Sequence, residues 1–133
     1  MVSISILLGK TLTGILSAKN STSDDEIFFK LDTGKEYRMY HDQDCCESVY
    51  IESIEGDLND LLDSPITMAE EYSTNHDEKE NSINRRRTFS ESTTYTFYKL
   101  ATVKGYVNIR WFGSSNGYYS ESVYFSEVGN KYE

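Results

Sequence analysis

The sequence predicts a mainly β protein of the α+β class, with a single curled or barrel-like antiparallel sheet of about six to seven strands and one short helix. Two observations support this fold class: apolar and polar residues alternate over most of the chain, and Gly, Asn and Asp punctuate it at short intervals. A third is the high Tyr content, eleven in 133 residues, because Tyr is enriched in half-buried strands. The length fits one domain, residues 1–133.

The first strands are expected to form an opening meander. Residues 11–19 and 26–32 are rich in β-forming side chains, and an Asp-Thr-Gly-Lys turn at residues 32–35 leads into residues 36–41. Residues 47–54 alternate in the same way. They predict a fourth strand.

A change of period after the fourth strand predicts the helix. Leu58, Leu61 and Leu62 recur at helical spacing, so they are expected to share one face. Asp57 can cap the start of this helix, and Pro65 cannot continue it. The result would be a short helix laid on the sheet.

The alternation of apolar and polar residues stops in the middle of the chain. Residues 66–72 are compatible with a returning strand. Residues 73–92 are dominated by Asn, Asp, Glu, Lys, Ser and Arg without periodicity, so we expect a mobile polar loop there.

Two successive antiparallel hairpins are predicted in the C-terminal third. Their strands are residues 93–103, 106–112 and 118–128, joined by a Lys-Gly turn and a Gly-rich loop. Alternation places Glu121 on the apolar face of the last strand. A buried carboxylate at that position would need a polar partner.

Negative charge is concentrated between Asp42 and Glu80, where thirteen Asp and Glu residues face one Lys, while the whole chain carries −9. This balance argues against direct binding to nucleic acid or to an anionic membrane, because both depend on Lys and Arg. It favours a basic or a small partner. The N-terminus lacks the features of a signal peptide, and no run approaches the ~20 apolar residues of a membrane helix, so we expect a cytoplasmic protein.

The two cysteines, Cys45 and Cys46, are neighbours, which disfavours an ordinary intrachain disulfide and predicts reduced thiols. Together with His41 they are candidate zinc ligands, and Asp42 or Asp44 could complete a tetrahedral set. Adjacent cysteines point in different directions, however. Buried or hydrogen-bonded thiols are therefore favoured over a metal site and over a Cys nucleophile with His41 as its base. No cofactor is expected.

Two segments carry a resemblance to a known family: HDQDCCESVYIESIEGDLNDLLDSPI (residues 41–66) and TFYKLATVKGYVNIRWFGSSNGYYSESVYF (residues 96–125). They resemble an uncharacterised family of small acidic proteins encoded by bacteriophages and prophages. The resemblance implies a host bacterial cytoplasm and a role against bacterial antiviral defence. It implies no catalytic residues.

The leading functional hypothesis is a non-enzymatic, anti-CRISPR-like inhibitor. Its acidic surface would imitate nucleic acid and bind a basic, nucleic-acid-handling host defence protein. A solvated acidic surface without a partner is the alternative interpretation of the same charge. The candidate partner-binding residues are Glu52, Glu55, Asp57, Asp60, Asp63, Glu70 and Glu71.

The second hypothesis is a sponge that sequesters a small nucleotide immune signal. Aromatic rings, an Arg and hydroxyls on the C-terminal strands are the components of a nucleotide pocket. The same residue types are more typical of sheet packing or of a contact between copies of the chain. The candidate ligand-binding residues are Tyr106, Asn108, Arg110, Trp111, Tyr118, Ser122 and Tyr124.

Overall fold

The computed structural model describes residues 2–18, 25–77 and 92–128. The strands in these ranges are β1 (Leu12–Ala18), β2 (Glu26–Leu31), β3 (Glu36–Tyr40), β4 (Ser48–Glu55), β5 (Met68–Asp77), β6 (Ser92–Thr102), β7 (Gly105–Ser115) and β8 (Tyr124–Glu127). Two 3₁₀ turns accompany them, η1 (Ile4–Leu7) and η2 (Leu58–Leu61).

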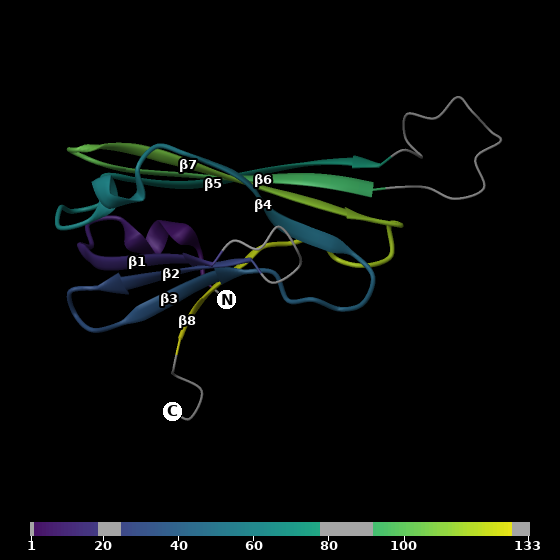
Figure 1. Cartoon of the computed structure of the whole chain (residues 1–133), viewed down its shortest axis with the longest axis horizontal. Helices are drawn as coiled ribbons and strands as arrows, with labels where there is room; N and C mark the ends of the chain where they lie inside the picture. Colours follow the sequence, from purple (N-terminus) through teal and green to yellow (C-terminus); the bar gives the residue numbers. More distant parts are fainter. Residues whose placement is uncertain (1, 19–24, 78–91, 129–133) are drawn as a thin grey trace.

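The strands form two four-stranded antiparallel sheets that pack as a β-sandwich (Figure 1). The meander sheet has the order β1-β2-β3-β8, and the hairpin sheet has the order β4-β7-β6-β5. The single curled or barrel-like sheet expected from the sequence is therefore wrong. Alternation tells which side chains are buried but not how many sheets share the burial.

One hydrophobic core lies between the two sheets, because each sheet turns its apolar face inward. The indole of Trp111 on β7 is 1 % exposed, and its N–H lies 3.3 Å from the sulfur of Met39 on β3. Other large, fully buried side chains come from both sheets: Tyr98, Phe29, Ile51 and Leu100. The N-terminal turn η1 adds Ile4 and Leu7 to this core.

Local connections follow the sequence prediction. The opening meander is confirmed, since β1 pairs with β2 and β2 pairs with β3. The first C-terminal hairpin is confirmed as well, because β6 and β7 pair antiparallel up to Thr102 opposite Gly105. Short turns join β2 to β3 and β6 to β7, which are neighbours along the chain.

The second predicted hairpin is wrong. Strand β8 pairs with β3 of the meander sheet, with Tyr40 opposite Tyr124, and β7 pairs instead with β4 and β6. Residues 116–123 leave the hairpin sheet before β8 begins. Alternation in β8 shows which side chains face the core, but the same alternation fits either sheet.

The predicted helix is a single 3₁₀ turn, η2. Asp57 caps it as expected, because its side chain accepts a hydrogen bond from the Asn59 N–H at 2.9 Å. The turn ends at Leu61 because Leu62 already forms a β-bridge with Leu12. Pairing with β1 thus outweighs the helical periodicity of three leucines.

The predicted loop at residues 73–92 is too long. Strand β5 continues to Asp77, whose partner is Ser92 at the start of β6, and residues 78–91 lie outside the described residues. The sequence of residues 73–77 is polar throughout, so it lacks the alternation that marks a strand. Backbone pairing with β6 holds them in the sheet regardless of side chain.

Within the described residues the chain passes between the two sheets twice, through residues 41–47 and residues 116–123. Both crossings lie at the end of the sandwich seen on the right in Figure 1, whereas η2 lies at the opposite end. No helix in the described ranges is long and apolar enough to span a membrane.

Replacing Trp111 with Ala should lower the free energy of unfolding by about 3–5 kcal/mol, because it leaves a large cavity between the sheets. Urea unfolding of the purified protein measures this loss. Tyr106→Ala on the same strand is the control: Tyr106 is 63 % exposed, and the change should cost about 0.5 kcal/mol or less. Equal losses in both variants would contradict the placement of Trp111 in the core.

Candidate functional site

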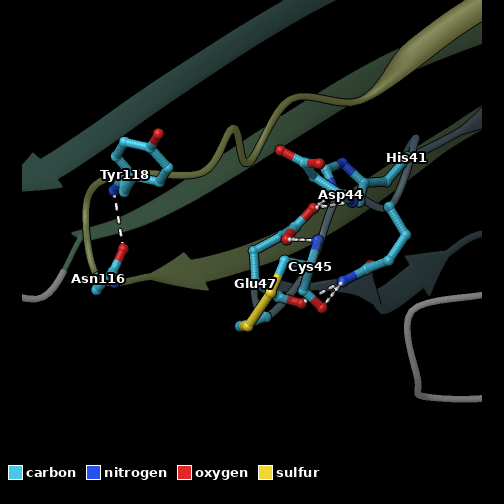
Figure 2. The surroundings of a disulfide bond; sticks show 8 residues. His41, Asp44, Cys45, Glu47, Asn116 and Tyr118 are labelled. Carbon is cyan, nitrogen blue, oxygen red and sulfur yellow. Dashed lines mark hydrogen bonds and ion pairs between the residues drawn. A yellow bond between two sulfur atoms is a disulfide. The ribbon is translucent and has the colours of Figure 1, made fainter.

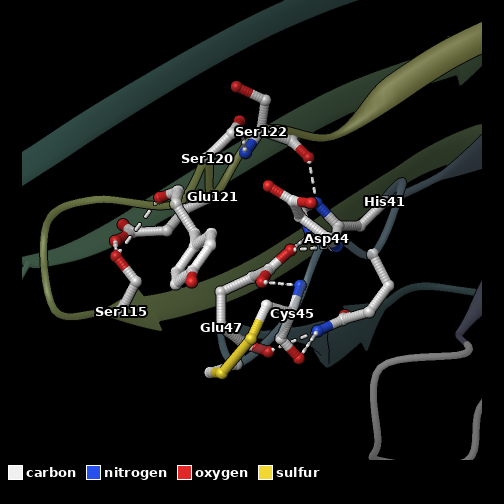
Figure 3. A network of polar contacts seen from close by, with 11 residues as sticks. His41, Asp44, Cys45, Glu47, Ser115, Ser120, Glu121 and Ser122 are labelled. Atoms are coloured by element: carbon white, nitrogen blue, oxygen red, sulfur yellow. Dashed lines mark hydrogen bonds and ion pairs between the residues drawn. A yellow bond between two sulfur atoms is a disulfide. The ribbon is translucent and has the colours of Figure 1, made fainter.

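The two crossings meet in a buried polar network that we call the crossover cluster, consisting of His41, Glu47 and Glu121 with their hydrogen-bond partners (Figure 3). His41 directly follows β3, and Glu47 directly precedes β4. Their side chains are 0 % exposed. The cluster therefore ties together the places where the chain leaves one sheet and enters the other.

Both ring nitrogens of His41 face oxygen atoms. Nδ1 lies 2.6 Å from the carbonyl oxygen of Ser122, which can only accept a hydrogen bond, so Nδ1 carries a proton. Nε2 lies 2.8 Å from a carboxylate oxygen of Glu47. With Glu47 ionised, Nε2 donates as well, and the pair is an imidazolium–carboxylate ion pair.

Glu47 is held in its ionised form by several donors. Burial alone would raise its pKa, but the backbone N–H groups of Cys45 and Asp44, at 2.9 and 2.7 Å, and the His41 ring outweigh burial. Together they lower the pKa from 4.5 to about 2. The residues between His41 and Glu47 thus fold into a closed loop around this carboxylate.

Glu121 is the buried carboxylate that alternation indicates, and it has the partners that burial requires. It is 8 % exposed and accepts hydrogen bonds from the hydroxyls of Thr94 at 2.6 Å and Ser115 at 2.5 Å. Gly113 makes room for it, since a Cβ at that position would lie 2.9 Å from the Glu121 Cβ. The second crossing is thereby fixed to β6 and β7.

A third buried carboxylate links the sheets near the same crossings. Asp25 precedes β2 of the meander sheet, and its Oδ2 accepts a hydrogen bond at 2.8 Å from the N–H of Ile51 on β4. Asp25 is 2 % exposed. The ionisable groups at this end serve as fixed connections between sheets, and solvent does not reach the His41 or Glu47 side chains.

The cysteines differ from the prediction of reduced, buried thiols. Cys45 and Cys46 are exposed and joined to each other by a disulfide at the tip of the loop that encloses Glu47 (Figure 2). His41 has both nitrogens engaged elsewhere, so the structure does not bring these three residues into one ligand set. Among the described residues no group of three or more His, Cys, Asp or Glu is placed to hold a metal ion.

The predicted acidic surface is divided by the fold. Four of its residues lie on one surface segment that we call the acidic turn (residues 55–63), which contains Glu55, Asp57, Asp60 and Asp63. Glu52 lies apart on β4 in an ion pair with Arg110 at 2.7 Å. The carboxylates at residues 42–47 lie beyond the far end of β4, whose eight residues span roughly 26 Å at ~3.3 Å each.

Glu70 and Glu71 lie on the edge strand β5, where they help to line an open groove of about 980 Å³ between β5 and η1. Partial burial raises the pKa of Glu71, and a hydrogen bond from the Tyr98 hydroxyl opposes that rise. Burial and the neighbouring Glu71 also raise the pKa of Tyr98. This pair is a local contact at the sheet edge, separate from the acidic turn.

The predicted ligand-binding residues do not converge on one pocket. Tyr106, Asn108 and Arg110 share the outer face of β7, but Trp111 points into the core. Residues 118 and 122 lie on the second crossing, and Tyr124 opens β8 in the other sheet. The residues are close in sequence, but the crossing separates them in space.

Two features of the site were missed at the sequence level. The first is the ion pair between His41 and Glu47, although both residues stand inside the motif singled out there. The second is a set of five rings on the outer face of the hairpin sheet: Tyr50, Tyr72, Tyr95, Phe97 and Phe112. Alternation within each strand could have placed each ring outward, but only the strand order makes them neighbours.

Fold and cluster together define the class: a two-sheet β-sandwich protein whose buried carboxylates are hydrogen-bonded inside the fold. Residues 5–125 match DUF7448, a domain of unknown function, and the chain belongs to that family. This agrees with the resemblance to an uncharacterised family. No curated protein and no solved structure matches the chain.

Replacing Glu47 with Gln should destabilise the protein by about 3 kcal/mol at neutral pH, because it breaks a buried ion pair. The pKa of Glu47 is lowered on folding, so its ionised form contributes stability above pH 4.5, and this contribution is lost as the pH falls towards 2. The difference in unfolding free energy between wild type and Glu47→Gln should therefore shrink across that range. Glu55→Gln, an exposed site, is the control; a difference that stays constant with pH would contradict the assignment.

The double substitution Cys45→Ser with Cys46→Ser should leave stability within about 0.5 kcal/mol of wild type. A cross-link between adjacent residues closes almost no loop, so it removes little entropy from the unfolded chain. The donor to Glu47 is the Cys45 backbone N–H, which the substitution keeps. Urea unfolding with and without reductant tests this; a loss above about 1 kcal/mol would show that the sulfurs hold the loop.

Proposed function

We propose that this protein is a non-enzymatic inhibitor of bacterial antiviral defence that binds a basic, nucleic-acid-handling host protein in the cytoplasm. The acidic turn is its partner-binding surface. The proposed surface is smaller than the one expected from the sequence. Its centre is residues 55–63, and Glu52, Glu70 and Glu71 lie outside that centre.

The observation that carries the proposal is the charge of the acidic turn. Glu55, Asp57 and Asp63 are exposed, and residues 55–63 contain no Lys or Arg. The described part of the chain places no ion pair on these three carboxylates. Unpaired carboxylates on one turn attract a basic groove and speed its association.

The turn is also held in a defined shape, which favours recognition over mere solvation. Asp57 caps η2, Leu61 anchors it in the core, and the Thr102 hydroxyl donates to the Asp60 carbonyl oxygen. Asp63 adopts a positive φ of 63° at its end. A surface fixed in advance loses less conformational entropy when it binds.

The role against host defence rests on the resemblance to phage-encoded proteins. Such proteins act in a host bacterial cytoplasm, where defence enzymes bind nucleic acid through basic grooves. An acidic chain of this size can block such a groove without any chemistry of its own. The buried, fully bonded ionisable groups of the crossover cluster are in keeping with a binding role.

The alternative, a nucleotide sponge, receives less support from the geometry. Its seven candidate residues are spread over two sheets and one crossing, and Arg110 already forms an ion pair with Glu52. A phosphate would have to displace that carboxylate and approach a chain of net charge −9.

The test is a triple substitution, Asp57→Asn, Asp60→Asn and Asp63→Asn. Asn keeps the cap at position 57 and tolerates the positive φ at position 63, so the fold is preserved. Loss of three surface charges at about 0.5 kcal/mol each should weaken partner binding about tenfold. Affinity for the partner recovered from defence-expressing cells, and phage plating on those cells, measure the effect.

The matched control removes three exposed carboxylates elsewhere, Asp32→Asn, Asp42→Asn and Asp44→Asn, with the same change in net charge. It should keep both activities. Equal loss in the two triple variants would show that overall charge, and not the acidic turn, drives binding. Wild-type protein that leaves phage plating unchanged would overturn the role against defence.

A further inference from the structure

The outer face of the hairpin sheet carries a continuous row of aromatic rings. Four successive ring contacts, with centroids 5.1–6.2 Å apart, run Tyr50–Phe112–Tyr95–Phe97–Tyr72. The row begins on the edge strand β4 and ends on the edge strand β5, so it crosses all four strands. Two members are Phe, which have no polar group to direct towards water.

This face lies outside the core of the sandwich. Tyr72 is 64 % exposed, and the other four rings are half-buried. In Figure 1 no described strand lies above the hairpin sheet on the side away from the meander sheet. A contiguous apolar surface of this kind in the described part of the chain indicates a site for another protein surface.

The charges on the face nearly balance one another. Arg110 forms an ion pair with Glu52 at 2.7 Å and lies 5.8 Å from the centroid of the Tyr95 ring. Lys99 stands between Glu70 on β5 and Asn108 on β7 in the strand register. Glu55 also faces outward, opposite Asn108, and lines a hollow with Lys99 and Arg110. Three carboxylates thus stand against two cations, which leaves a net charge of −1 on this face in a chain of net charge −9.

This small net charge decides what can cover the face. An anionic ligand would meet cations that already have carboxylate neighbours, and a basic protein would find more unpaired carboxylates on the acidic turn. A second copy of the chain faces strong repulsion elsewhere on its surface. When two copies meet at this face, a two-fold axis brings the rings of one copy against the rings of the other, and the charged side chains against the same side chains.

The size of the face suits such a contact. Four strands ~4.8 Å apart and about eight residues of ~3.3 Å each give a projected area of roughly 500 Å² for one copy. Two copies would bury about 1,000 Å², near the lower limit for a specific interface. Sheets also pack face to face readily, with side chains of the two faces interdigitated.

We propose that the chain forms a two-fold symmetric dimer through the outer face of the hairpin sheet, with the aromatic row of one copy packed against that of the other. This inference does not rest on the proposed function. It assigns a role to the rings, whereas the partner site is the acidic turn, which shares Glu55 with this face.

Sedimentation velocity over a concentration series, at low and high salt, tests the dimer. We expect a species of twice 15.3 kDa that persists at high salt, because apolar contacts are not screened. Tyr72→Lys and, separately, Phe97→Lys should raise the dissociation constant about tenfold or more. Tyr72 is so exposed that its substitution leaves the fold intact, as circular dichroism would check.

Leu16→Lys is the matched control, because Leu16 is 65 % exposed on β1 of the other sheet. It should dimerise like wild type. A monomer at every concentration would overturn the proposal and leave the face to a different partner. A dimer unaffected by both ring substitutions, or one dissociated by Leu16→Lys, would overturn it as well.

Discussion

The ion pair between His41 and Glu47 is the contact on which the arrangement of the two sheets depends. The described chain passes between the sheets only at residues 41–47 and residues 116–123, and His41 joins both passages through Glu47 and the Ser122 carbonyl. Antiparallel pairing stabilises each sheet separately, but it says nothing about their relative placement. The hydrophobic core favours contact between the sheets, and this directional pair, together with the Asp25 bond to the Ile51 N–H, selects one alignment.

The sequence predicts those parts of the fold that depend on neighbours along the chain. The opening meander and the hairpin of β6 and β7 follow from alternation and turn residues, because both pairings are local. The pairing of β8 with β3 joins residues more than eighty positions apart, such as Tyr40 and Tyr124. Alternation is identical for either sheet, so no local pattern could have chosen between them.

In the candidate site, too, the sequence predicts what depends on a local pattern and not what depends on contacts between distant segments. Alternation placed Glu121 in the core and so required hydrogen-bond partners, which the hydroxyls of Thr94 and Ser115 supply. Alternation also places Glu47 on the buried face of Val49 and Ile51, so it signals a second buried carboxylate. Its partner His41 could not be predicted in the same way, because the two side chains meet only through the fold of the crossing. The acidic block is contiguous in sequence, yet the fold distributes it. Residues 42–47 and 55–63 lie at opposite ends of β4, and Glu70 and Glu71 lie on β5.

That division makes the two ends electrically independent. About 26 Å of strand separates the start of β4 from the acidic turn, and this is roughly three times the Debye length of ~8 Å at physiological salt. Salt therefore screens the electrostatic interaction between the charges at the crossings and the carboxylates of residues 55–63. The carboxylates buried at the crossings can maintain the fold, while those on the acidic turn remain free to change with a partner. A single continuous acidic surface would have coupled these two roles.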